Sequence, residues 1–550
     1  MRKFFFLCIS LIITYAAFSQ NKNESSATNE FQRPKLVVGI VIDQMRWDYL
    51  YRYYNLYQPD GGFKRLLNNG FSCENTFIPY TPTVTACGHT SIYTGSVPAI
   101  NGIAGNQWWD YNSSQLVYCT EDDNVTTVGS NTDVGKMSPH NLLVTTIGDE
   151  LHLATNFRSK VIGIALKDRA AILPAGHSAN AAYWCDEKNG TWITSSYYMK
   201  ELPQWVKELN AKKLVDSYFA KDWNTLYPIN QYTQSTPDEE PYEYRPFGTN
   251  QKGFPYHLSQ FIGKNYGVLP VTPYGNTFTF AMAKAAIEGE KLGKDSATDM
   301  LAISLSTPDY IGHTFGPNSV EQEDDYLRLD KDLGDFLNYL DTQIGKGEYV
   351  IFLSADHGAA HVPAFLKEHK IPAGNINDAS ITTDLNNLLK DKFKTDKLVI
   401  GIMDFQVYLD HHAMAAVHLD KEQVYNAVID YLQQQPGVSR AIALDRLNDA
   451  TLNTTIKNML INGYYPSRSG DIQIVPEPQW IEGFEAGGTT HGVWNPYDSH
   501  IPLLWYGWNI LNGKTSRKVL MTDIAPTIAA MLHIQMPNGC IGNVIEEILK

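Results

Sequence analysis

The stretch KLVVGIVID, residues 35–43, is a continuous apolar run that ends on an aspartate. A run of this length without polar alternation is typical of a strand covered on both faces, as in a parallel sheet. Three further runs have the same form and also end in charged or imidazole side chains: KVIGIALKDR (160–169), DMLAISLSTPDYIGH (299–313) and EYVIFLSADHG (348–358). We therefore predict one shared site, because ligands bind outside the carboxyl ends of parallel strands.

Helix-like segments lie between these runs, including residues 320–344 and 522–534. Alternating strands and helices predict an α/β fold with a mostly parallel central sheet and helices on both faces. Two stretches break this rhythm. Residues from about 183–275 are rich in Tyr, Trp, Pro and Asn, and residues from about 360–480 predict a small α+β cap. We interpret both as insertions in one catalytic domain that covers residues 33–550.

The N-terminus has the form of a Sec-type signal peptide. Arg2 and Lys3 precede an apolar run, and small residues stand before Gln20. We expect residues 1–19 to be the signal peptide and 20–32 a polar leader. Because Cys8 lies inside the apolar run, a lipid-modified N-terminal cysteine is not expected. The mature protein is then exported, to the periplasm or the medium, with no later segment apolar enough for membrane insertion.

Composition excludes some functions. The 550-residue chain has a formal net charge of -15 at pH 7, which disfavours nucleic-acid binding. The five cysteines beyond the signal peptide show no Cys-x-x-Cys spacing, so a cysteine zinc site is not expected, and any disulfide pairing stays open. The sequence does not separate monomer from dimer, although we slightly favour a monomer.

The polar residues near the strand ends include types that hold metal ions. The set is Asp43, Asp309, His313, Asp356, His357 and His491. Asp309 and His313 are four residues apart, which places them on one face of a helix. Three carboxylates and three imidazoles suit two zinc sites of about three protein ligands each, which could clamp an in-line phosphoryl displacement. Taken singly, an aspartate after a strand is more often a turn or helix-cap residue.

The segment TPTVTACGHTSIYTG, residues 81–95, predicts the start of a helix, whose free N–H groups favour an anion. Thr85 in this segment has two interpretations. It could be an N-cap, where threonine is common. It could instead be a nucleophile whose hydroxyl is activated by a metal ion. Alone, Thr85 favours the cap, but beside the metal set we interpret it as the nucleophile.

Two cations follow another of the strands. Lys167 and Arg169 are two residues apart, so an extended backbone would place both on one face. They could hold the non-bridging oxygens of a phosphoryl group, with arginine as a fork and lysine as a point charge. The alternative is a solvated strand end. Asn106, in NGIAGNQWWD, is a further candidate donor to the same oxygens.

In their order along the chain, these residues resemble the motif set of the alkaline phosphatase superfamily, and in particular the PafA-type secreted bacterial alkaline phosphatases. The resemblance covers nearly the whole mature chain. It implies two Zn²⁺ ions per chain, one held by Asp309, His313 and His491. The second would be held by Asp43, Asp356 and His357, together with Thr85.

The resemblance also implies a reaction. The threonine at position 85 would be phosphorylated transiently, and a hydroxide on the first zinc would then release phosphate. Lys167, Arg169 and Asn106 would bind the phosphoryl oxygens. The expected activity is that of a phosphoric monoester hydrolase with broad specificity, acting on small-molecule phosphate monoesters for phosphate scavenging. The natural substrate is not specified.

Two alternatives remain. The nucleotide pyrophosphatase/phosphodiesterase branch is similar in its metal ligands and threonine, but the Lys-x-Arg pair matches the three non-bridging oxygens of a monoester dianion. A non-catalytic exported binding protein on the same fold is the alternative from another class, and the complete residue set argues against it. Sulfatases are excluded because Cys87 is not followed by their Cys-x-Pro-x-Arg motif.

Overall fold

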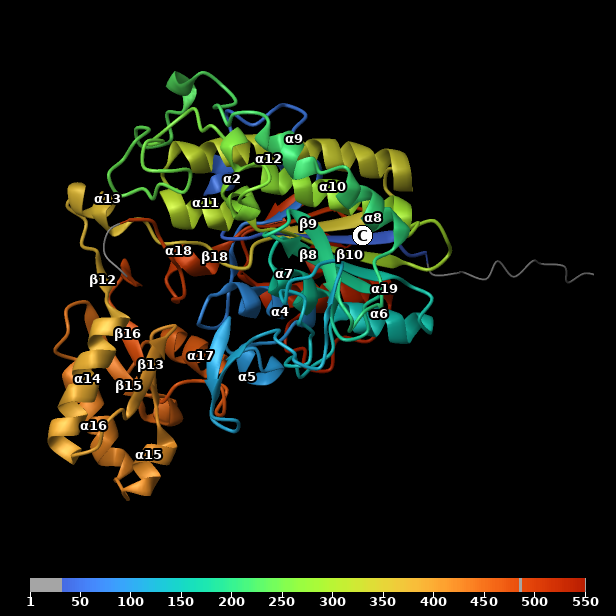
Figure 1. The fold of residues 1–550 in the computed structure, drawn as a ribbon. Helices are drawn as coiled ribbons and strands as arrows, with labels where there is room; N and C mark the ends of the chain where they lie inside the picture. Colours follow the sequence, from blue (N-terminus) through green and yellow to red (C-terminus); the bar gives the residue numbers. More distant parts are fainter. Residues whose placement is uncertain (1–31, 484–486, 550) are drawn as a thin grey trace, which may run out of the picture. The chain divides into compact units, whose positions relative to one another are not determined.

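A ten-stranded sheet forms the centre of the structure, a computed structural model that describes residues 32–483 and 487–549 (Figure 1). The predicted signal peptide and all but the last residue of the leader lie outside the described residues. In spatial order the strands are β20 (Gly513–Thr515), β2 (Phe71–Cys73), β19 (Leu503–Gly507), β11 (Tyr349–Ser354), β1 (Leu36–Ile42), β10 (Asp299–Leu305), β7 (Val161–Ile164), β8 (Ala181–Asp186), β9 (Thr191–Ser195) and β6 (Thr127–Val128).

The four strands expected from the sequence are neighbours in this sheet. Strands β11, β1, β10 and β7 run parallel, and β8 continues the parallel set. Antiparallel strands flank this set, because β19 pairs with β11 and β9 pairs with β8. The sheet is therefore mixed, with the expected parallel strands at its centre.

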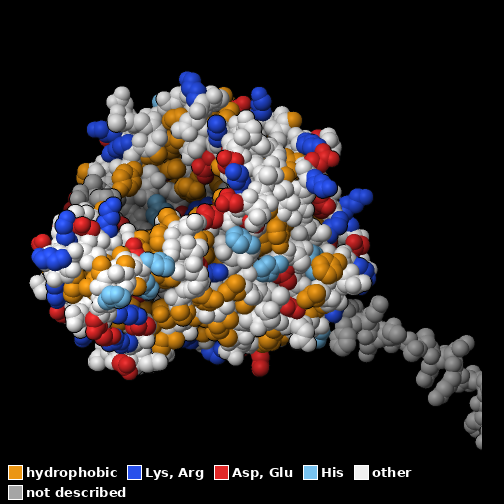
Figure 2. Space-filling view, turned by 60° about the horizontal axis from the view of Figure 1, so that its bottom comes forward, with side chains coloured by type: hydrophobic (Ala, Val, Ile, Leu, Met, Phe, Trp, Pro, Cys, Tyr) orange, Lys and Arg blue, Asp and Glu red, His pale blue; other side chains and the backbone are white. Residues whose placement is uncertain are grey.

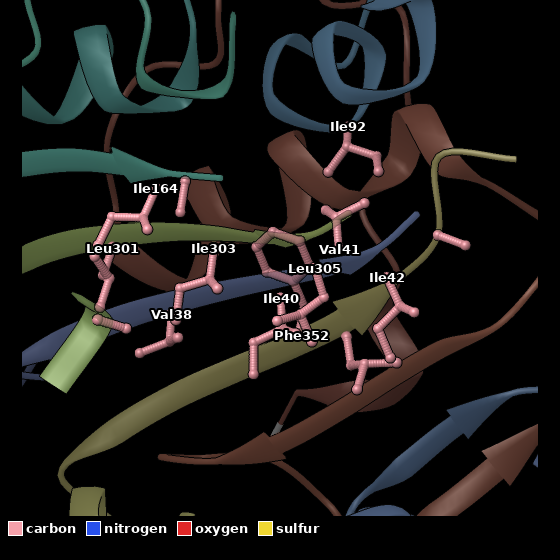
Figure 3. Close-up of a cluster of buried hydrophobic side chains, with 14 of the residues drawn as sticks. Val38, Ile40, Val41, Ile42, Ile92, Ile164, Leu301, Ile303, Leu305 and Phe352 are labelled. Carbon is pink, nitrogen blue, oxygen red and sulfur yellow. The ribbon is translucent and has the colours of Figure 1, made fainter. Parts of the chain in front are cut away.

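The central strands are buried on both faces. All seven residues of β1 are buried, and Figure 3 shows side chains of neighbouring strands, such as Ile40, Ile303 and Phe352, packed in one cluster with Ile92 of helix α4 (Thr85–Thr94). Burial of each large aliphatic side chain contributes roughly 1.5–3 kcal/mol. This explains why β1 has no polar alternation and why its first polar residue, Asp43, marks the end of the strand.

Helices cover both faces of the sheet, as expected (Figure 1). On one side lie α10 (Tyr274–Gly289), α11 (Thr307–Phe315) and α12 (Val320–Leu340). On the other lie α4, α6 (Ile147–Thr155), α7 (Asp168–Ala175) and α19 (Ile524–Leu532). Local sequence sets the helix starts: the Ser319 side chain accepts a hydrogen bond from the Gln322 N–H before α12, and Thr146 with Asp149 forms a capping box on α6.

The chain between residues 374 and 482 builds smaller sheets. The four-stranded one contains β13 (Val399–Met403), β14 (Gln406–Leu409), β16 (Ile472–Pro476) and β15 (Val438–Ala443). With it pack α14 (Asp378–Phe393), α15 (His411–Ala416) and α16 (Lys421–Leu432), around an apolar cluster separate from that of the main sheet. The fourth helix, α17 (Thr454–Gly463), packs in a smaller cluster with Leu444 and Leu447. We call this four-stranded sheet and its helices the cap. Strands β12 (Gly374–Ile376) and β17 (Trp480–Glu482) pair beside it.

Strands β8 and β9 extend the main sheet, although most of β8 and all of β9 lie in the first stretch that we expected to be an insertion. The limits of both insertions stay a prediction. A hairpin of β4 (Gln107–Asp110) and β5 (Gln115–Tyr118) follows α5 (Pro98–Asn101), and β3 (Thr76–Phe77) pairs with β18 (His500–Ile501) and β21 (Val519–Leu520). Shorter helices are α2 (Tyr49–Arg52), α3 (Gly62–Asn69), α8 (Gln204–Ala211), α9 (Leu214–Phe219), α13 (Pro363–Glu368) and α18 (Pro496–Ser499).

Two further observations concern the described residues alone. Their five cysteines are all free thiols, and four of these are buried, so no disulfide forms among them. None of their helices is long and apolar enough to cross a bilayer.

Candidate metal and catalytic site

Three aspartates meet at the carboxyl edge of the central strands. The register pairs Ile42 with Leu305 and Val41 with Ser354, so β1, β10 and β11 end almost level. Asp43 follows β1 directly, Asp309 lies in the first turn of α11, and Asp356 lies two residues beyond β11. All three are at least 97 % buried. These three carboxylates therefore lie together, as the sequence predicted.

Asp43, Asp356 and His357 form the first of two groups that could hold a metal ion. The His357 Nε2 atom lies 3.5 Å from Asp43 Oδ1 and 3.4 Å from Asp356 Oδ2. None of these three buried atoms has a hydrogen-bond partner among the described residues. Tetrahedral ligands about 2.1 Å from a zinc ion are separated by about 3.4 Å, so the three atoms fit such an ion.

Asp309 lies between His313 and His491. Its Oδ1 atom is 3.1 Å from His313 Nε2 and 3.7 Å from His491 Nε2. Because α11 is helical from Thr307, Asp309 and His313 share one face, as expected. The second group that could hold a metal ion contains Asp309, His357 and His491, and its two imidazoles stack with ring centres 3.5 Å apart. His313 contacts Asp309 but is not part of this group. The two groups are thus adjacent and meet at His357.

Each of the three histidines is held by a backbone carbonyl. The Nδ1 atoms of His357, His313 and His491 lie 2.9, 2.7 and 2.7 Å from the carbonyl oxygens of Gly358, Thr489 and Thr83, respectively. A carbonyl only accepts, so Nδ1 carries the proton in each ring and Nε2 presents a lone pair. This is the form in which a histidine binds a metal ion.

Charge explains why the carboxylates need a cation. Burial, followed by repulsion from Asp309 and Asp356, raises the pKa of Asp43 well above its usual range. Burial also opposes ionisation of Asp356, but His357 and His89 outweigh it and hold the pKa of Asp356 below its ordinary value. The Lys167 ammonium, 2.7 Å from Asp43 Oδ2 and 2.5 Å from Asp309 Oδ2, compensates part of this charge.

Two residues that the sequence did not single out as site residues support these carboxylates. The Gln44 backbone N–H donates to Asp356 Oδ1 at 3.2 Å, and its side-chain amide donates to Asp309 Oδ1 at 2.7 Å. His89 is fully buried, and its Nδ1 lies 3.2 Å from Asp356 Oδ2. The sequence offered one signal for each residue: Gln44 follows Asp43 directly, and His89 is four residues from Thr85. Neither reveals contacts with strands 200 or more residues away.

Thr85 is the first residue of α4, and Val84 occupies the N-cap position. The Val84 side chain forms no capping hydrogen bond and Thr85 lies inside the helix, so the cap interpretation of Thr85 is wrong. The first turn packs directly on the metal-binding group: a Cβ at Gly88 would lie 2.4 Å from the Asp356 carbonyl oxygen. Thr85 is 1 % exposed. Its hydroxyl group therefore belongs to a buried, polar helix N-terminus beside the carboxylates.

The backbone expected for the cation pair is also wrong. Strand β7 ends at Ile164, Lys167 is extended at the N-cap of α7, and Arg169 is already helical. The helix begins at Asp168, whose carboxylate accepts from the Arg169 N–H in the first turn. Both cations still border one cavity of about 540 Å³, with Tyr118 and Tyr310 among its walls. Figure 2 shows a recess on one face of the molecule, with acidic and basic side chains mixed along its rim.

Asn106 lies beside the helix that begins at Thr85. Its Oδ1 accepts from the Ala86 N–H at 2.9 Å. This bond fixes the amide with its NH₂ group left to donate. The ten predicted site residues thus come from strand ends, helices, the residue before the β4–β5 hairpin and, for His491, the loop before α18, and they gather around α4 and the carboxyl edge of β1, β10, β11 and β7.

The fold and site define an α/β protein with two adjacent Asp/His groups and a threonine on a helix N-terminus. A family model described as type I phosphodiesterase / nucleotide pyrophosphatase matches residues 37–498. The chain belongs to this family.

Several curated relatives match nearly full length. The alkaline phosphatase PhoV of Synechococcus elongatus is 53% identical over 99% of both chains. A Myroides odoratus protein named calcium-transporting ATPase is 52% identical over 95% of this chain and 96% of its own. The alkaline phosphatase PafA of Elizabethkingia meningoseptica is 49% identical over 95% of this chain and 96% of its own. A crystal structure of PafA superposes with a TM-score of 0.93 and 49% identity, covering 95% of this chain and all of that one.

Proposed function

We propose that this chain is an alkaline phosphatase, a hydrolase that converts phosphate monoesters to an alcohol and inorganic phosphate. The observation that carries the proposal is the convergence of Thr85, two Asp/His groups and two cations at one edge of the sheet. Similarity of about 50% to PhoV and PafA over nearly the whole chain supports the same activity. We further propose two Zn²⁺ ions, one held by Asp43, Asp356 and His357 and the other by Asp309, His313 and His491, because mixed carboxylate and imidazole ligands at these separations suit zinc.

Zinc ions bound there would supply Lewis-acid chemistry, stabilising the charge on the attacking and leaving oxygens. The chain's own residues do the rest. Thr85 Oγ forms a bond to phosphorus as the bond to the alcohol oxygen breaks, which gives a phosphothreonine. Water then attacks phosphorus, releases phosphate and restores Thr85. The α4 N–H groups favour the negative charge that stays next to this residue throughout.

Lys167, Arg169 and Asn106 would hold the non-bridging oxygens. A monoester dianion presents three such oxygens, and charge-assisted donors on them stabilise the transition state. A diester has one charge fewer and a second substituent that needs room. The two cations therefore favour a monoesterase over the diesterase alternative.

The cellular setting is a proposal of the same kind. The signal peptide predicted from the sequence supports export to the periplasm or the medium. Export, a small-molecule substrate and broad specificity together suit phosphate scavenging.

The test is kcat/KM of the mature, zinc-loaded protein on an aryl phosphate monoester and on the matching diester, with zinc content measured in parallel. We expect strong preference for the monoester and two zinc ions per chain. Arg169→Ala should lower the monoester value by about 10- to 100-fold and the diester value much less. Diester preference would overturn the substrate class, and no turnover of either ester would favour the binding-protein alternative.

A further inference from the structure

The β4–β5 hairpin joins Asn106 to Tyr118. Asn106 directly precedes β4, and Tyr118 is the last residue of β5, opposite Gln107. The Cys119 N–H donates to the Asn106 carbonyl oxygen at 3.0 Å, which closes the base of the hairpin. The hairpin therefore holds Asn106 and Tyr118 in a fixed position relative to each other.

The Tyr118 hydroxyl connects this hairpin to the start of α7. It donates to Asp168 Oδ1 at 2.6 Å and accepts from Arg169 Nη1 at 3.0 Å. A phenol has one proton to donate. Because Asp168 takes that proton, a lone pair of the oxygen is left facing the guanidinium. The direction of both hydrogen bonds is thus determined.

Arg169 keeps donors for a ligand. Its Nε–H is buried and has no hydrogen-bond partner among the described residues, although the side chain borders the same cavity as Lys167. An arginine side chain loses about 2 kcal/mol of conformational entropy when it is fixed. The hydrogen bond to Nη1 restricts the side chain before substrate binds, so less conformational entropy is lost on binding. The other N–H groups of Arg169 are left to bind the substrate.

We propose that Tyr118 is a positioning residue for phosphate monoester hydrolysis: it holds the Arg169 guanidinium, from the hairpin that also carries Asn106, in the orientation that binds the phosphoryl group. This inference rests on the proposed function. Tyr118 touches no reacting atom itself. It acts through Arg169, and the hairpin sets the spacing between two of the groups that bind oxygen.

The experiment is a double-mutant cycle of Tyr118→Phe and Arg169→Ala on the full mature, zinc-loaded protein. The phenylalanine keeps the ring and removes one hydrogen bond to a charged group, so kcat/KM for an aryl monoester should fall about 5- to 20-fold. The diester value should change less than about 2-fold, because it depends less on Arg169. In the Arg169→Ala background, Tyr118→Phe should have no further effect.

Tyr111→Phe is the matched control. Tyr111 lies in the turn of the same hairpin, and its hydroxyl also donates to a carboxylate. That carboxylate is Asp471 Oδ2, at 2.7 Å, which belongs to the cap and not to the start of α7. Tyr111→Phe should leave the monoester-to-diester ratio unchanged, whatever it does to thermal stability. The inhibition constant of inorganic phosphate gives an independent readout, since it should weaken in Tyr118→Phe and not in Tyr111→Phe.

The outcomes separate the inference from the function on which it rests. Suppose that wild type hydrolyses monoesters. If Tyr118→Phe lowers kcat/KM equally for the monoester and the diester, or if its effect adds fully to that of Arg169→Ala, Tyr118 is structural only and the inference is overturned. If wild type shows no monoesterase activity, the proposed function fails before the cycle begins.

Discussion

Buried carboxylates occur both at the strand-end site and in the cap, and their surroundings differ. Asp471 of the cap accepts hydrogen bonds from the Leu409 N–H, the Tyr111 and Tyr425 hydroxyls and the His411 ring. Asp43 and Asp356 of the site are more deeply buried, yet each keeps one oxygen without a hydrogen-bond partner among the described residues.

The pKa values of Asp471 and Asp43 are shifted in opposite directions. Burial opposes ionisation of Asp471, but His411, Tyr425 and Tyr111 outweigh it and lower its pKa. Burial and neighbouring carboxylates instead raise the pKa of Asp43. A buried charge without donors is costly to fold. The comparison teaches that the cap carboxylate stabilises the fold, whereas the site carboxylates are arranged for a cation that offsets their repulsion.

Thr85→Ala should have the largest effect on activity. Loss of the nucleophile should lower kcat by at least about 1,000-fold. Folding should be unchanged, because Thr85 caps nothing and alanine is a good helix former. Steady-state kinetics with circular dichroism checks both points.

Thr454→Ala is the control from the cap, where threonine is also the first residue of a helix but is exposed. It should leave kcat within about 2-fold, as surface substitutions usually do little. A similar loss in both variants would remove the distinction between the regions.

Asp43→Asn should come next, with kcat lowered by about 100-fold through weaker metal binding. Because the folded pKa of Asp43 is raised, its contribution to the stability of the metal-free fold is full below the unfolded pKa and is lost as pH rises through the folded pKa. At pH 7, which is above the unfolded pKa, the raised pKa of Asp43 therefore costs stability. Metal-free Asp43→Asn should therefore melt no lower than metal-free wild type in a chelator, as measured by calorimetry. A clear drop in Tm would contradict the repulsion argument.

Asp471→Asn should change activity least, within about 2-fold, and lower the free energy of unfolding by about 1–3 kcal/mol. The lowered pKa of Asp471 means that its contribution is present above the unfolded value of about 3.9 and is lost as pH falls through the folded value. Denaturant unfolding at pH 7 and at pH 3 checks this. The difference between wild type and variant should shrink at pH 3, and a constant difference would exclude the carboxylate as its source.

Much of the site could be predicted because it follows buried strands. A buried run such as residues 36–42 must end where a charged residue follows it, and parallel strands end at one edge of the sheet. Asp43, Asp309 and Asp356 could therefore be brought together from sequence. The start of α4 was equally visible. The helical backbone at Arg169 could not be predicted, because the N-cap residue of α7 is Lys167, whose side chain forms no capping hydrogen bond.

The sequence by itself determined the buried strands, the helix that starts at Thr85 and the residue types gathered at the strand ends, since these follow from local periodicity and from the cost of burying charge. Only the tertiary structure decided which partner each side chain has. Gln44 contacts Asp356 across 312 residues, and Tyr118 contacts Arg169 across 51. Such hydrogen bonds depend on distances of about 3 Å between segments remote in sequence, and no local pattern contains them.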